Sequence, residues 1–223
     1  MKKHLSVFLY ALLAGFCIGL GGTVFLRLKD AFPGGNVVGA LLFTIGLFTI
    51  CTRGYNLFTG KACYLFDNKP DYILTLAVIW IGNLLGCLIL ALIERATGLC
   101  GTETGIDAAA RAMVEGKMAA GFGSLFLLGV VCNVFIFIAV NGYANNPHEL
   151  GKYLSLFLGV SVFILCGTEH SVADMYYWSV SGVLFENLGG SLLRLLIISL
   201  GNVVGGVSFP LMEKAYKKLT ASN

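Results

Sequence analysis

The chain has 223 residues, of which 57% are hydrophobic and 12% are charged, and its mean hydropathy is +0.83. Soluble domains carry about 25% charged residues and disordered chains have low hydrophobicity, so the composition excludes both classes. The net charge of +3 is small and comes from scattered basic residues, which argues against nucleic acid as a partner. We therefore expect a multi-pass integral membrane protein that lies in the lipid bilayer.

Six apolar segments follow one another along the chain, and a membrane-spanning helix needs about 20 such residues. The first segment follows Lys2 and Lys3 and is too long for the apolar part of a signal peptide, so we expect it to be retained. No linker is long enough to separate two domains, and the polar segment 102–117 predicts a short interfacial helix. The sequence thus predicts an all-α membrane protein, a single transmembrane domain over 1–223 with six helices at about 5–26, 36–66, 72–95, 118–141, 151–183 and 191–212.

Two of these segments, 36–66 and 151–183, are too long for one straight span and carry polar residues in the middle. The polar residues run from Thr52 to Asn56 in the former and from Gly167 to His170 in the latter. Each segment therefore predicts two half-helices joined by an unwound piece, which survives at membrane depth only where protein or a water-filled cavity satisfies its backbone. Two breaks at matching places predict an inverted repeat with a site near the membrane midplane.

A motif common to 72–95 and 191–212 supports the repeat. Residues 82–86 read GNLLG and residues 201–205 read GNVVG, so the first three helices and the last three are predicted to be two copies of one unit. We expect Asn83 and Asn202 to support the two helix breaks. The alternative is that small residues at spacing four only allow the helices to pack closely.

The orientation in the membrane is encoded weakly. Basic residues are enriched in cytoplasmic loops of membrane proteins, but in this chain they are spread almost evenly over the two sides. Clusters at the two ends, Lys2-Lys3 and Lys214 to Lys218, favour cytoplasmic termini of a protein in the cell (inner) membrane.

Ionisable groups inside apolar segments are costly and are therefore functional candidates. His170 is the one histidine inside such a segment; it is a candidate to exchange a proton or donate a hydrogen bond, and the alternative is a structural bridge between two backbone ends. Glu169 and Asp174 are candidates to pair with basic groups or with freed backbone N–H groups, and Asp174 alternatively to cap the second half-helix. Lys61 lies at the start of the second half of 36–66, where the helix dipole disfavours a cation. It either faces a vestibule and attracts anions or extends to the lipid headgroups.

No enzyme motif occurs in the sequence, which lacks His-Glu-x-x-His, a phosphate-binding glycine loop and a serine nucleophile elbow. The three histidines are far apart and the seven cysteines form no Cys-x-x-Cys, so we expect neither a metal site nor a cofactor. The chain is predicted not to be an enzyme.

Several segments, in order along nearly the whole chain, resemble the formate/nitrite transporter family. Residues 167–175 (GTEHSVADM) resemble the signature of the fifth helix, 57–59 (LFT) the break in the second, 129–133 (GVVCN) the fourth helix, and the two Gly-Asn pairs the third and sixth. The resemblance implies an aquaporin-like protomer in a homopentamer with one pore per subunit. It also implies passage of small monovalent anions such as formate, nitrite or hydrosulfide.

The same resemblance assigns roles by position. At the pore centre it places Thr59 facing His170, with Glu169 and Asn133 nearby. It implies an apolar constriction of Phe43 and Leu47 on one side and of Phe163 on the other, and a basic residue, Lys117, that attracts anions at a vestibule. Two positions depart from the family pattern, because Thr168 replaces the usual aromatic residue and Asp174 the usual asparagine.

A bare anion would be strongly disfavoured in apolar constrictions because it would lose its hydration. We therefore expect pH-dependent transport, in which protons are a second partner and the anion takes up a proton from His170 or from water near the pore centre. One alternative is an aquaporin-type channel for a small neutral solute, although the paired Asn-Pro-Ala motifs typical of that class are absent from the sequence. A second is a non-transporting membrane scaffold, which would not explain two broken helices with polar centres.

Overall fold

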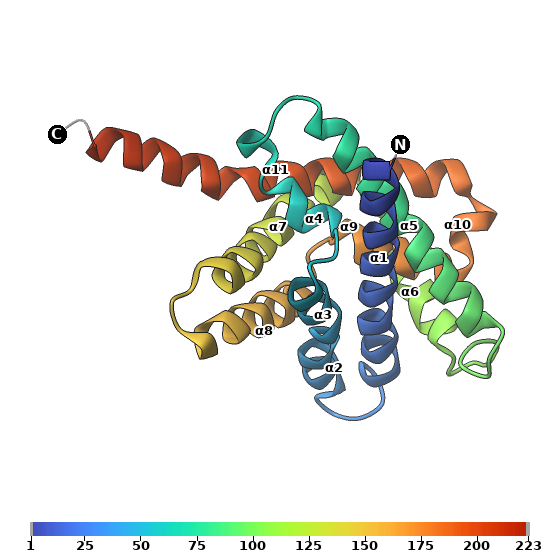
Figure 1. Cartoon of the computed structure of the whole chain (residues 1–223). Coiled ribbons are helices and arrows are strands. Elements are labelled where there is room, and N and C mark those ends of the chain that lie inside the picture. The colour runs from blue at the N-terminus through green and yellow to red at the C-terminus, as the bar shows by residue number, and fades with distance from the viewer. Residues whose placement is uncertain (1, 222–223) are drawn as a thin grey trace.

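The computed structural model describes residues 2–221, with side chains from residue 4 onward, and this range is helical throughout apart from turns and connections. The side chains of Lys2 and Lys3, on which part of the orientation argument depends, lie outside the described ones. Figure 1 shows the order of the elements: α1 (Lys2–Leu28), α2 (Gly35–Phe43), α3 (Ile45–Arg53), α4 (Phe58–Ala62), a 3-10 turn (Leu65–Asp67), α5 (Tyr72–Arg95), α6 (Ile106–Ala119), α7 (Phe122–Asn145), α8 (Glu149–Leu165), α9 (Ser171–Ser181), α10 (Val183–Glu186) and α11 (Leu188–Thr220).

Five stretches of helix in the described range are long and apolar enough to cross a membrane: His4–Leu28, Gly35–Arg53, Tyr72–Arg95, Phe122–Asn145 and Leu188–Thr220. The second of these is α2 and α3 together. The remaining predicted segment, 151–183, is divided into α8 and α9, each too short to count alone. Both predicted interruptions are therefore present, one between α3 and α4 and the other between α8 and α9.

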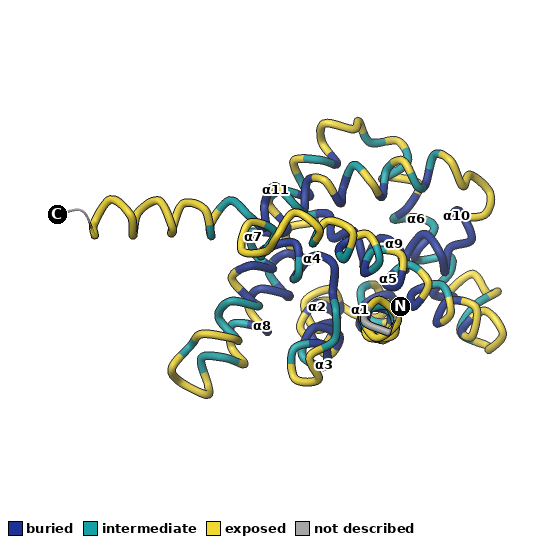
Figure 2. Tube along the Cα trace, turned by 45° about the horizontal axis from the view of Figure 1, so that its top comes forward, coloured by how far each residue is buried: buried dark blue, intermediate teal, exposed yellow. Residues whose placement is uncertain are grey.

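Several helix boundaries differ from the predicted ones by a few residues. The segment 118–141 is represented by α7, which begins only at Phe122, because α6 continues to Ala119; Lys117 lies on this short helix, as the predicted helix over 102–117 implied. The last helix, predicted to end at 212, continues to Thr220. Residues 213–220 (EKAYKKLT) are mostly strong helix formers with lysines in the last turn, where the helix dipole favours cations. This extension projects from the rest of the molecule and is exposed along its length (Figures 1 and 2).

Asn83 on α5 connects the first helix break to the bundle. Its side-chain Oδ1 accepts a hydrogen bond from the backbone N of Phe58, the first residue of α4, at 2.8 Å. Its Nδ2 donates to the carbonyl oxygens of Ala11 on α1 at 2.7 Å and of Asn56 in the break at 3.0 Å. One buried amide thus satisfies two backbone groups at the first break and bonds them to the backbone of α1.

Asn202 on α11 makes the same three bonds at the second break. Its Oδ1 accepts from the backbone N of Ser171, the first residue of α9, at 2.9 Å. Its Nδ2 donates to the carbonyl oxygens of Gly129 on α7 at 2.8 Å and of Glu169 in the break at 2.9 Å. The two Gly-Asn motifs therefore serve equivalent structural roles, as the predicted repeat requires.

The glycines of the two motifs bring the helix backbones into direct contact. A Cβ atom on Gly86 of α5 would lie 2.0 Å from the carbonyl oxygen of Leu12 on α1. A Cβ atom on Gly205 of α11 would lie 2.0 Å from the carbonyl oxygen of Val130 on α7. Since the obstructing atoms are backbone, only glycine allows this approach, and α5 packs along α1 as α11 packs along α7. The alternative of close packing is therefore an additional role of the motif, not a competing one.

Candidate functional site

The two helix breaks meet at a hydrogen bond between Thr59 and His170. Thr59 is the second residue of α4, and His170 is the residue that directly precedes α9. Thr59 Oγ1 lies 2.9 Å from His170 Nε2, and both side chains are buried. The pair predicted to face each other at the centre is therefore in direct contact in the structure.

The local backbone fixes which ring nitrogen of His170 carries the proton. His170 caps α9, because its Nδ1 accepts a hydrogen bond from the backbone N of Ala173 at 3.0 Å. A backbone amide can only donate, so Nδ1 is unprotonated and the neutral ring holds its hydrogen on Nε2, which donates to Thr59 Oγ1. The hydroxyl hydrogen of Thr59 then remains available for another acceptor.

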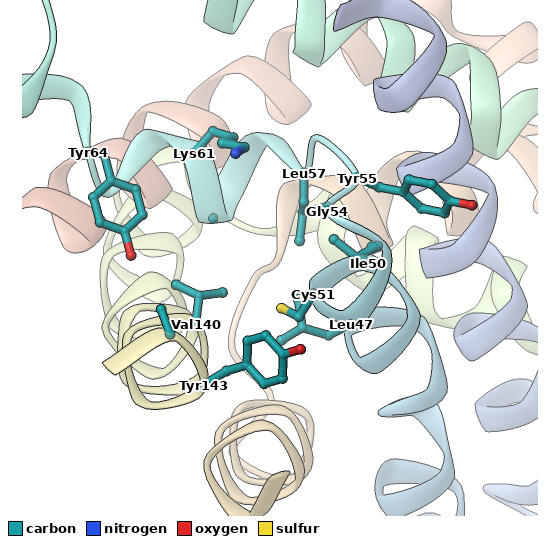
Figure 3. Close-up of a pocket in the computed structure, with 12 residues that line it drawn as sticks. Leu47, Ile50, Cys51, Gly54, Tyr55, Leu57, Lys61, Tyr64, Val140 and Tyr143 are labelled. Atoms are coloured by element: carbon teal, nitrogen blue, oxygen red, sulfur yellow. The ribbon is translucent and has the colours of Figure 1, made fainter. Parts of the chain in front are cut away.

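Two cavities, lined by different helices, lie next to the Thr59–His170 pair. The first, here called the Lys61 cavity, has a volume of about 240 Å³ and is lined by residues of α3, α4, α7 and the break before α4, which include Leu47, Leu57, Gly60, Lys61 and Val140 (Figure 3). The second, the Lys117 cavity, has a volume of about 250 Å³, and its lining includes Lys117, Phe163, Glu169, His170 and Asp174. One cavity thus reaches the residue next to Thr59 and the other reaches His170 itself.

The apolar side chains predicted to form constrictions are grouped differently in the structure from the way that the resemblance implied. The rings of Phe43 and Phe163 meet edge to face with centroids 6.2 Å apart, and Phe163 stacks on His170 at 5.3 Å. Phe43 therefore belongs with Phe163 and not with Leu47. Leu47 lines the opposite cavity, together with Leu57 and Val140.

Leu57 and Val140, which line the Lys61 cavity beside Leu47, were not identified from the sequence as candidate site residues. Leu57 belongs to the Leu-Phe-Thr motif at the break, which was a usable signal. Val140 is one of many apolar residues along α7, and nothing in its neighbourhood in the sequence distinguishes it from a lipid-facing residue.

Asn133 on α7 fixes the position of α4 at Thr59. Its Nδ2 donates to the carbonyl oxygen of Thr59 at 3.1 Å, and its side chain is buried. The structure thus places Asn133 beside Thr59, where it fixes the backbone of α4. Its Oδ1 has no hydrogen-bond partner among the described residues.

Lys117 does not present a free ammonium group to the cavity. Its Nζ lies 2.8 Å from Asp174 Oδ1 and also forms an ion pair with Glu169. Of the two roles predicted for Asp174, the structure shows pairing with a basic group, since His170 is the residue that caps α9. The ammonium is therefore shared between two carboxylates, one of which stands where the family pattern has an amide.

Lys61 lies in the Lys61 cavity, and no ion pair of the described residues involves it. The sequence placed it at the start of a half-helix, where the dipole is unfavourable. Lys61 does lie near the start of the second half, as the fourth residue of α4, but α4 has only five residues and Lys61 also lies in its last turn, so the unfavourable dipole argued from the sequence does not apply.

A buried polar cluster outside the pore was also missed. Glu94 near the end of α5 accepts a hydrogen bond from the hydroxyl of Tyr176 at 2.7 Å and another from Thr23. All three side chains come from different helices, α5, α9 and α1, and no described cation neutralises Glu94. Its position close to the predicted helix end resembled an ordinary residue at the membrane surface, so the sequence carried no signal for it.

A model of the family described as formate/nitrite transporter matches residues 1–216. The chain belongs to the formate/nitrite transporter family. The formate channel FocB of Escherichia coli is 24% identical over 237 residues, which cover 92% of this chain and 84% of that protein. The nitrite transporter NirC of Salmonella typhimurium is 28% identical over 224 residues, which cover 93% and 81% of the two chains.

Solved structures of the formate/nitrite transporter family have the same fold. A chain described as an FNT family ion channel superposes with a TM-score of 0.84 at 27% identity, covering 96% of this chain and 90% of that one. A pentameric formate channel with formate bound gives a TM-score of 0.82 at 27% identity and 98% coverage of both chains. The predicted family and the predicted all-α, aquaporin-like membrane fold are confirmed. The protein is a multi-pass integral membrane channel or transporter for small anions rather than an enzyme.

Proposed function

We propose that each subunit passes a small monovalent anion, namely formate, nitrite or hydrosulfide, along a path that joins the Lys61 and Lys117 cavities past Thr59 and His170. The observation that carries the proposal is the buried Thr59–His170 hydrogen bond where the two helix breaks meet between the cavities. Relatives named as a formate channel and a nitrite transporter support the substrate class. By analogy with the pentameric relative, the protein assembles as a homopentamer. The lysine clusters near its two ends favour the cell (inner) membrane with both termini in the cytoplasm.

The substrate crosses the centre as the neutral acid. Phe43 and Phe163 on one side, and Leu47, Leu57 and Val140 on the other, offer no hydrogen bonds to an ion, so a charged substrate would be strongly disfavoured there. Lys61 attracts the anion into its cavity, and the free hydroxyl hydrogen of Thr59 stabilises it near the centre. The rate of uptake therefore rises as pH falls.

His170 orients Thr59 and does not itself give up the transferred proton. To become a cation, its ring would have to protonate Nδ1 and lose the hydrogen bond from Ala173. The proton therefore comes from another group or from water in a cavity. The sequence left His170 and water open as proton sources, and the proposal retains only sources other than His170.

The test is uptake into proteoliposomes. Formate, nitrite and hydrosulfide are presented in turn across a pH series, with His170→Asn alongside, because an asparagine side chain can still accept from Ala173 N and preserve the cap. Selective uptake of one anion that rises as pH falls, with the same pH profile in His170→Asn, supports the proposal. Flux of water or glycerol without any anion would indicate an aquaporin-type channel, and folded protein without flux would indicate a scaffold.

A further inference from the structure

The cluster of Lys117, Glu169 and Asp174 contains two acids and one base. Lys117 comes from α6, Glu169 from the break and Asp174 from α9, and the three side chains are only 14%, 7% and 1% exposed. All three line the Lys117 cavity next to His170. The cluster thus lies at the wall of the proposed path, on the side of Phe163.

Full ionisation would leave this cluster with one uncompensated negative charge. No second cation is in contact with either carboxylate among the side chains that the structure describes. The other titratable groups that face the cluster are neutral in form, namely His170 at the break, Tyr177 on α9 and Cys132 on α7. Among the described residues, no ion pair joins Asp174 to a group on α1, α4, α5, α10 or α11.

A buried negative charge is unfavourable by itself and would also repel an anion in the cavity. Two carboxyl groups that share one site do not both ionise readily, so one of them keeps a proton. The geometry shows where the proton fits: Asp174 Oδ1 binds Lys117 at 2.8 Å, whereas the buried Oδ2 has no hydrogen-bond partner in the described part of the chain. An ionised oxygen in that position would be unsatisfied, whereas an O–H group there is neutral and can donate to a molecule in the cavity.

We propose that Glu169 and Asp174 jointly hold one proton against Lys117, and that this carboxyl pair is the proton donor and acceptor for the anion in the Lys117 cavity. The O–H bond of the carboxyl group breaks as an O–H bond, or for hydrosulfide an S–H bond, forms on the anion, so the neutral acid leaves for the centre. Both groups are then carboxylates, and Lys117 stabilises them until water in the cavity returns a proton to the pair. The inference rests on the proposed function and names the proton source that His170 cannot be.

The variant that tests this inference is Asp174→Asn, which restores the amide of the family pattern and leaves one acid paired with one base. The control is Glu115→Gln, which removes one carboxylate from the exposed side of α6. Both variants and the wild-type protein are reconstituted into liposomes that contain a pH indicator. The entry of protons that formate drives and the uptake of formate are measured in the same vesicles. At pH 7 we expect Asp174→Asn to lower proton entry about tenfold or more while Glu115→Gln changes it less than about twofold. At pH 5, where bulk water supplies the proton, the variants are expected to converge.

A second measurement does not depend on transport. Infrared difference spectra of the purified protein at pH 7 report the carbonyl stretch of protonated carboxyl groups, and we expect Asp174→Asn and Glu169→Gln each to abolish the same single band. Any contribution of Glu94 is unchanged in both and cancels. A wild-type pH profile in Asp174→Asn, or a wild-type band in both variants, would overturn the inference. If the wild-type protein transported none of the three anions while both variants still lacked the infrared band, the proposed function would be contradicted and the shared proton would stand.

Discussion

At the scale of single residues, the direction of one hydrogen bond determines what the pore centre can do. The backbone N of Ala173 can only donate, and this sets the proton of His170 on Nε2 and turns it toward Thr59. In the proposed path, the polar group that the substrate meets is therefore the Thr59 hydroxyl, positioned by a neutral imidazole. A charged histidine would also have to leave its cap, which links the protonation state of the ring to the integrity of α9.

Replacing Thr59 by valine keeps the shape of the side chain and removes its hydroxyl. We expect the initial rate of formate uptake to fall about tenfold, which corresponds to the loss of one buried hydrogen bond of about 1–1.5 kcal/mol. Thr59→Ser is the matched control and should keep a rate near that of the wild type. Equal rates in Thr59→Val and Thr59→Ser at the same pH would contradict a role for the hydroxyl.

The two asparagines of the Gly-Asn motifs should have equal effects on stability. Truncation of Asn83 or of Asn202 to alanine leaves the backbone N–H that begins the half-helix and one carbonyl oxygen of the break without this partner, and we expect each to lower the free energy of unfolding by roughly 3 kcal/mol. Thermal unfolding in detergent measures this loss. The control is Asn145→Ala, whose exposed side chain bonds only to Asn141 and should change little. A large loss at one asparagine and none at the other would contradict their equivalence.

At the scale of helices, the breaks were predictable from the sequence because polar residues in the middle of an apolar segment are too costly in lipid unless the helix unwinds around a polar site. The Gly-Asn repeats were also visible, since the same backbone problem arises twice and is solved by the same residue. The pairing of Phe43 with Phe163 was not predictable, because it depends on how α2 approaches α8 across about 120 residues of chain. The ion pairs of Lys117 likewise depend on where α6 docks, which no local pattern encodes.

The helix α6 is held by contacts at its outer side. Arg111 forms a two-point ion pair with Glu186, one arm of which is 3.1 Å long, and donates to the carbonyl oxygen of Ser181. Arg194 on α11 donates to the carbonyl oxygen of Met118. These contacts position the helix that supplies Lys117 to the cavity wall.

Glu186 lies outside the spanning helices, and its pairing with Arg111 predicts a dependence of stability on pH. Hydrogen bonds from Arg111 lower the pKa of the Glu186 carboxyl below its ordinary value. A lowered folded-state pKa contributes stability above the unfolded value of about 4.3, and the contribution is lost as pH falls through the folded-state pKa. We therefore expect Glu186→Gln to lower the Tm at pH 7 and the difference from wild type to vanish at strongly acidic pH.

The control for this comparison is Glu115→Gln. Glu115 lies on the same face of α6 as Arg111, and the two side chains form an exposed ion pair of 3.7 Å, which is longer than the pair of Arg111 with Glu186. Its replacement should change the Tm less than Glu186→Gln does at pH 7. A Tm difference for Glu186→Gln that persisted unchanged to acidic pH would show that the ion pair is not its cause.

At the scale of the whole molecule, the proposed path lies within one chain. The Thr59–His170 pair, both cavities and the apolar side chains beside them come from a single subunit, with the two repeats each supplying one half-helix. In the homopentamer proposed above, the central axis is therefore not needed for conduction. Each subunit is expected to work independently of its neighbours.

Mixed oligomers test this independence. Differently tagged wild-type and Thr59→Val subunits are co-expressed at several ratios, purified as mixed assemblies and reconstituted at equal protein content. Because each subunit holds its own path, formate uptake should fall linearly with the fraction of variant subunits, down to the rate of the pure variant. A path shared between subunits would need several intact copies at once, so uptake would fall much more steeply and be near its minimum when half of the subunits are variant. A steep curve would therefore contradict five separate pores, while a straight line would show that one chain is the transporting unit.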